Sequence, residues 1–106
     1  MNGDFDLVKE LVRNSQQAFL ATIGEGAPLA SAAGYVFEEK GDFGTIVLLL
    51  SDLARHTRNL KKNPALCLLV VEPSDAPIHE KKRASFSGEA RLVEDRVHPG
   101  LREHAG

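Results

Sequence analysis

Apolar residues recur at two different spacings along the first third of the chain, and each spacing predicts a different element. Residues 4–14 place four apolar side chains on one face at helical spacing, with charged residues around the rest, which predicts a short amphipathic helix. Two extended runs follow at residues 17–23 and 28–37, separated by the turn-forming Gly24-Glu25-Gly26. The pattern therefore predicts a helix followed by two strands joined by a tight turn.

Continuous apolar runs mark two further strands. Residues 45–50 and 65–72 are almost wholly apolar, which is typical of strands buried on both faces. Cys67 lies within the second run and is expected to be a small buried hydrophobic residue. Residues 83–92 alternate small or apolar residues with polar ones, and we interpret them as the last strand.

A helix is predicted between these apolar runs. Residues 53–62 contain neither glycine nor proline, and Ser51 and Asp52 offer side-chain acceptors for the first turn. Asn63-Pro64 ends the helix, because proline cannot continue it.

The order of elements is helix, three strands, helix, two strands, which predicts a β-rich α+β class. Five strands with a helix between the third and the fourth can close most of a small Greek-key barrel. We expect one domain at residues 1–94 and a weakly ordered polar tail at residues 95–106. A chain of 106 residues leaves much apolar surface uncovered, so a partner subunit is also expected.

Composition limits the classes of function. The chain has 13 Lys and Arg against 15 Asp and Glu, a formal charge of −2, so any basic site must be local. With one cysteine, no Cys/His spacing suits a metal, and no apolar stretch suits a membrane span or signal peptide. A cytoplasmic location is expected. Nucleic-acid binding is not favoured, because only 6% of residues are aromatic, although the lysines and arginines of residues 55–62 and 81–83 could form one basic patch.

The segment from Ser51 to Pro64 carries the most chemistry. A helix N-terminus presents free N–H groups and partial positive charge, and Arg55 and His56 would add donors for the same anion. Ser51 and Thr57 could add hydroxyl groups, while the later cations would face solvent. The pattern predicts a phosphate site, with a capped helix bearing an ordinary charged face as the alternative.

Several segments in this order resemble the pyridoxamine-phosphate-oxidase-like split-barrel family of FMN-binding proteins. They are Ala21-Thr22-Ile23, Pro28, Arg55-His56, Asn59-Leu60, Asn63-Pro64 and Phe86-Ser87-Gly88-Glu89-Ala90. Ala54-Arg55-His56-Thr57-Arg58-Asn59-Leu60, with Lys81-Lys82-Arg83 before the last strand, is more similar to the haem-utilisation branch of that family.

The resemblance implies a site for the flavin phosphate. The family's basic pair falls on Arg55 and His56, with Ser51 beside them, and a phosphate-binding Arg of the oxidase branch is replaced by Ser31. Ser31 and Ala32 belong to a strand segment with side chains small enough for a flat ring to approach the backbone.

The resemblance also implies a homodimer, with the cofactor in the cleft between subunits and with Lys82 and Arg83 near the ring. FMN would make the protein an oxidoreductase, although no catalytic residue is identified. Haem binding or degradation is one alternative, with His98 and His104 as conceivable iron ligands, and a non-enzymatic flavin carrier is another.

Overall fold

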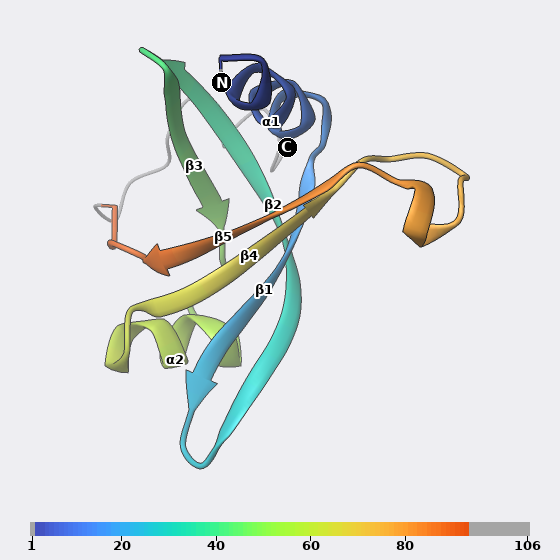
Figure 1. Cartoon of the computed structure of the whole chain (residues 1–106). Helices are drawn as coiled ribbons and strands as arrows, with labels where there is room; N and C mark the ends of the chain where they lie inside the picture. Colours follow the sequence, from blue (N-terminus) through green and yellow to red (C-terminus); the bar gives the residue numbers. More distant parts are fainter. Residues whose placement is uncertain (1, 94–106) are drawn as a thin grey trace.

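The computed structural model describes residues 2–93, with side chains from residue 5 onward, and contains one five-stranded antiparallel sheet with two α-helices (Figure 1). The elements are α1 (Asn2–Asn14), β1 (Gln17–Gly24), β2 (Ala27–Lys40), β3 (Phe43–Leu49), α2 (Arg55–Lys62), β4 (Ala65–Val71), a 3-10 helix η1 (Ile78–Glu80) and β5 (Arg83–Glu89). The predicted order of helices and strands is confirmed, and η1 is an addition. The strands lie in the order β3-β2-β1-β4-β5.

The sheet curls into a half-barrel whose two edge strands approach each other through their side chains (Figure 1). Phe43 on β3 and Phe86 on β5 stack with ring centroids 5.8 Å apart. Phe37 on β2 extends this cluster, 5.0 Å from Phe43. Because the edges meet through aromatic contacts and not through a ladder of hydrogen bonds, the predicted α+β split barrel is confirmed.

The core lies on the concave face of the sheet and is closed at one end by α1. Leu20 of β1 is 2% exposed, and Val12 of α1 is fully buried. The hydroxyl of buried Tyr35 donates a hydrogen bond to the Val12 carbonyl, 2.6 Å away, which ties the helix to β2. Burial raises the pKa of Tyr35, so this hydroxyl stays protonated and remains a donor.

On the convex face of the sheet, the central strand exposes apolar side chains in a single subunit. Phe19 and Ile23 on the central strand β1 are 48% and 49% exposed. Cys67 lies on the same face, opposite Ala21, and is partly exposed with Ser87 Oγ 3.7 Å from its sulfur. The predictions that Cys67 is buried and that residues 45–50 and 65–72 form strands buried on both faces are therefore wrong for one subunit. Both runs are apolar on two faces, but most of their residues are only partly buried, and the buried ones are Val47, Leu68 and Val70.

The second helix begins two residues later than predicted. Ser51 Oγ accepts a hydrogen bond from the Leu53 N–H at 3.2 Å, and the Ser51 carbonyl accepts one from the Ala54 N–H at 3.2 Å. These bonds form a separate turn, so Ser51 and Asp52 do not cap α2. The helix starts at Arg55 after Ala54 and ends at Lys62, followed by Asn63-Pro64 as predicted.

Two further sequence-based predictions concern the C-terminal tail and membrane-spanning helices. The expected tail at residues 95–106, with His98 and His104, lies outside the described residues. Within residues 2–93, no helix is both long enough and apolar enough to span a bilayer.

A surface ion pair joins α1 to β2 and carries a pH-dependent part of the stability. Arg13 donates to both oxygens of Glu39 at 2.7 and 2.8 Å, and it holds the pKa of that carboxyl below its ordinary value. A lowered pKa in the folded state stabilises the protein above the ordinary value, and this contribution disappears as pH falls through the folded pKa. We expect the difference in melting temperature between wild type and Glu39→Gln to be present at neutral pH and to vanish in acid.

The matched control is Glu89→Gln, which removes an exposed carboxyl that has no ion pair among the described residues. Its effect on melting temperature should be smaller at neutral pH. A Glu39→Gln difference that stays constant from neutral to acid pH would show that the ion pair does not contribute.

Candidate functional site

Helix α2 is positioned against the end of β1 by a close polar contact. Asn59 Nδ2 donates to Thr22 Oγ1 at 3.0 Å, and Thr22 is only 1% exposed. A Cβ on Gly24 would come within 3.2 Å of the Asn59 amide. The absence of a side chain at Gly24 therefore lets the helix lie directly on the strand.

Without a bound ligand, the residues of the first turn of α2 destabilise the helix. Its N-cap, Ala54, provides no side-chain hydrogen bond, and the first turn contains no acidic residue. Arg55 and Arg58 are exposed instead, and among the described residues neither forms an ion pair. Cations and uncapped N–H groups at a helix N-terminus repel each other electrostatically, and a bound anion relieves both. The start of α2 is therefore a candidate anion site.

His56 is held by Ser31, which the sequence placed in the same site. Ser31 Oγ lies 2.7 Å from His56 Nδ1, and the tautomer decides which atom donates. Nδ1 is thereby occupied, and Nε2 is the ring nitrogen left for a ligand. Thr57 does not contribute its hydroxyl, because that group is buried and donates to the Ser51 carbonyl. The Ser51 hydroxyl is exposed but accepts from Leu53.

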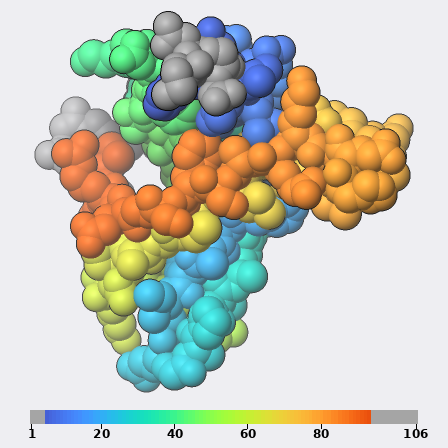
Figure 2. All heavy atoms as spheres, viewed as in Figure 1, coloured from blue at the N-terminus to red at the C-terminus, as the bar shows by residue number. Residues whose placement is uncertain are grey.

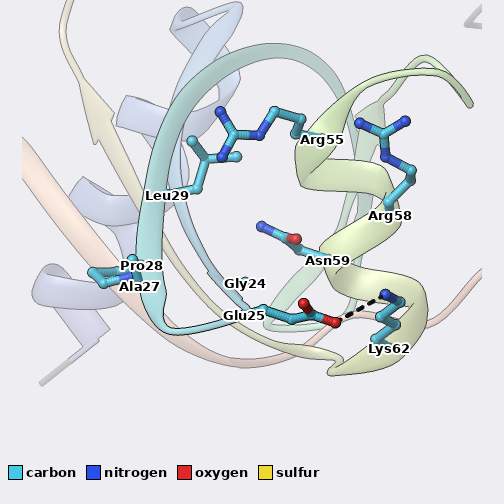
Figure 3. A pocket seen from close by; sticks show the side chains of 9 residues that line it. All are labelled: Gly24, Glu25, Ala27, Pro28, Leu29, Arg55, Arg58, Asn59 and Lys62. Atoms are coloured by element: carbon cyan, nitrogen blue, oxygen red, sulfur yellow. Dashed lines mark ion pairs between the residues drawn. The ribbon is translucent and has the colours of Figure 1, made fainter.

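An open cavity of about 290 Å³ lies between α2 and the β1–β2 hairpin (Figure 3). In Figure 3 the Arg55 side chain extends toward Leu29, the Asn59 amide points into the space between helix and hairpin, and Lys62 pairs with Glu25. That ion pair measures 3.6 Å. Arg58 also lines the cavity.

Sequence reasoning assigned Arg58 and Lys62 to solvent and gave Asn59 no role. The sequence spacing could have predicted that these residues act together. Arg55, Asn59 and Lys62 stand at i, i+4 and i+7 and therefore share one face of the helix. What the spacing lacked was the position of the hairpin opposite that face.

A free strand edge adjoins the site. Residues 34–40 of β2 pair with β3, whereas residues 27–33 pair only with β1 among the described residues. Ser31 faces the concave side opposite Leu20, and Ala32 faces the convex side opposite Phe19. With small side chains and an unpaired edge, this segment permits a flat ring to approach the backbone.

The structure does not bring Lys82 and Arg83 to this site within one subunit. Arg83 begins β5 opposite Val71, and its guanidinium donates to the carbonyls of Ile78 and Lys81. Figure 1 shows α2 and η1 at opposite ends of the sheet. The single basic patch considered for nucleic acid is therefore two separate groups of cations.

Comparison with known proteins agrees with the fold. A profile of the pyridoxamine 5'-phosphate oxidase family matches residues 5–100. Heme oxygenase HutZ of Vibrio cholerae serotype O1 is 32% identical over 90 residues, covering 82% of this chain and 49% of HutZ. The chain thus spans about half the length of the curated relative it matches.

Two solved structures of proteins named for haem are also similar. The crystal structure of HutZ, described as the haem storage protein from Vibrio cholerae, aligns with a TM-score of 0.70 at 30% identity, covering 92% of this chain and 68% of that chain. A haem-binding protein from Mycobacterium smegmatis aligns with a TM-score of 0.74 at 28% identity, covering 93% of this chain and 39% of that chain. The resemblance drawn from the sequence, including that to the haem-utilisation branch, is confirmed. The half-barrel and the family profile together establish that the chain belongs to the pyridoxamine 5'-phosphate oxidase family.

Proposed function

We propose that the chain binds haem, with the acidic side groups of the porphyrin at the start of α2 and the ring against the free edge of β2. The observation that carries this proposal is the first turn of α2, where Arg55 and Arg58 are exposed beside an uncapped helix terminus. Carboxylates would neutralise both arginines and accept from the free N–H groups. The haem functions in the names of the similar proteins support the choice of cofactor.

The described residues account for the acidic groups of haem better than for its iron. His56 is the histidine beside the arginines, and Ser31 occupies its Nδ1, leaving Nε2. His79 lies on η1, away from α2. The proposal therefore places the acidic groups and the ring and assigns no iron ligand among residues 2–93.

FMN is the second candidate, because Ser31 contacts His56 and Arg55 precedes His56 in the first turn of α2. When bound, FMN supplies hydride-transfer chemistry from its own ring. The residues of this chain would anchor the phosphate through Arg55 and orient it through His56. This reading makes the protein a flavin-dependent oxidoreductase, or a flavin carrier if no substrate site is completed.

A second copy of the chain is the proposed partner for the convex face of the sheet. Phe19 and Ile23 expose about half of their surface there, on a central strand whose other face is core. Packing two such faces together would remove this apolar area from water. The expected position of Lys82 and Arg83 near the cofactor would require that the partner subunit supply them.

The test is an absorbance titration of the purified chain with haemin and, separately, with FMN, followed by size-exclusion chromatography. We expect a saturable Soret band that elutes with a dimer. Saturable flavin binding without a Soret band would replace haem by FMN. Binding of neither cofactor would refute the proposed function.

A further inference from the structure

A second groove lies at the opposite end of the sheet from α2, between α1 and the start of β5. It has a volume of about 510 Å³ and is lined by Leu7, Val8, Leu11, His79, Lys81, Lys82, Arg83 and Ala84. Figure 2 shows the segment before β5 projecting from the body of the molecule beside α1. The groove shares no lining residue with the cavity beside Arg55.

The floor of the groove is apolar and continuous with the core. Leu11 is a 7% exposed member of the core cluster, and Val8 and Ala84 pack against that cluster. Leu7 stands one helical turn before Leu11 and is 53% exposed. Together these side chains form a narrow apolar strip that leads from the surface to the core.

The mouth of the groove is positively charged, and no acidic residue lines it among those described. Hydrogen bonds to the carbonyls of Ile78 and Lys81 hold the Arg83 guanidinium in place. The backbone of Lys82 is fixed through both of its polar groups, because its N–H donates to the Glu72 carboxylate at 2.9 Å and its carbonyl accepts from the Glu72 N–H at 2.9 Å. Neither Lys81 nor Lys82 forms an ion pair with a described residue.

We propose that this groove binds a long-chain carboxylate, with the alkyl chain on the strip from Leu7 to Leu11 and the carboxylate between Lys82 and Arg83. A narrow apolar floor beneath an unpaired cationic rim complements a molecule with one apolar tail and one negative head. A ligand with several charges would leave the strip exposed, and an uncharged lipid would leave the cations unpaired. Within one subunit, the site shares no lining residue with the cavity proposed for the cofactor at α2.

The experiment uses the full chain and the fluorescent probe 11-(dansylamino)undecanoic acid, followed by displacement with dodecanoate or dodecanol. We expect saturable binding of the probe, displaced by dodecanoate at concentrations roughly tenfold lower than by dodecanol, the ratio for one charge-assisted hydrogen bond. Lys82→Glu should weaken probe binding roughly tenfold or more through charge reversal. Leu7→Lys should do the same by interrupting the apolar strip, and it is tolerated in folding because Leu7 is half-exposed.

Two control variants separate this site from the cofactor site. Lys61→Glu reverses an exposed charge on α2, and Arg55→Gln alters the proposed cofactor site; both should bind the probe like wild type. Equal displacement by dodecanol and dodecanoate, or unchanged affinity in both groove variants, would overturn the proposal. Displacement of the probe by haemin or FMN that is lost in Arg55→Gln would also overturn it, because the groove would then belong to the cofactor site.

Discussion

Replacing Arg55 with glutamine is expected to weaken cofactor binding by about 1.5–3 kcal/mol, the contribution of one hydrogen bond to a charged group. That corresponds to a dissociation constant roughly 10 to 150 times larger in the absorbance titration. Glutamine keeps polarity and helix propensity, so the fold should be unaffected. The expected loss follows from the position of Arg55 at the uncapped start of α2, without an acidic partner among the described residues.

Lys61→Gln is the matched control for Arg55→Gln. Lys61 lies on the same helix, carries the same charge and is 53% exposed, but it does not line the cavity beside Arg55. Its dissociation constant should match that of wild type. Equal weakening in both variants would reduce the role of Arg55 to a general charge effect, and an unchanged Arg55→Gln would remove the anion site from the start of α2.

Truncating two neighbouring residues of β1 should have very different consequences, because they lie on opposite faces of the sheet. Leu20→Ala is expected to lower the free energy of unfolding by about 2–5 kcal/mol, since it opens a cavity in the core. Leu20 is 2% exposed, whereas Phe19 beside it is 48% exposed. For an isolated subunit, Phe19→Ala should cost only about 1 kcal/mol, because half of that surface is already in water.

Denaturant unfolding at two protein concentrations distinguishes the roles of these residues. If a second copy covers the convex face, wild type becomes more stable at higher concentration, and Phe19→Ala loses most of that gain. Leu20→Ala should still be more stable at the higher protein concentration, but its free energy of unfolding should be lower than that of wild type at both concentrations. Unfolding of wild type that is independent of concentration would contradict the proposed homodimer.

Local patterns predicted the elements well where one physical cause dominated. The turn at Gly24-Glu25-Gly26 lies between β1 and β2, and Asn63-Pro64 separates α2 from β4. The start of α2 was predicted too early, because Ser51 and Asp52 are good capping residues by type. In the structure the Ser51 hydroxyl accepts a hydrogen bond from the Leu53 N–H, in a separate turn that precedes α2.

The candidate site, like the elements, was predicted from the sequence only in part. The resemblance singled out Arg55, His56 and Ser31, and the structure brings His56 and Ser31 into contact. Lys82 and Arg83 came from the same resemblance, yet they lie at the other end of the sheet, in the groove beside α1. Their predicted role near the cofactor depends on a second subunit.

By itself, the sequence determined the order of helices and strands, the basic first turn of α2 and the membership of a split-barrel family, because these depend on residue type and short spacing. Only the tertiary structure decided which apolar face is covered, which cations share a cavity and where α2 lies. These depend on strand order and on contacts between distant segments, such as Asn59 with Thr22 and Phe43 with Phe86. Periodicity identifies the two faces of a strand, but only the curl of the sheet and the placement of helices decide which of them becomes the core.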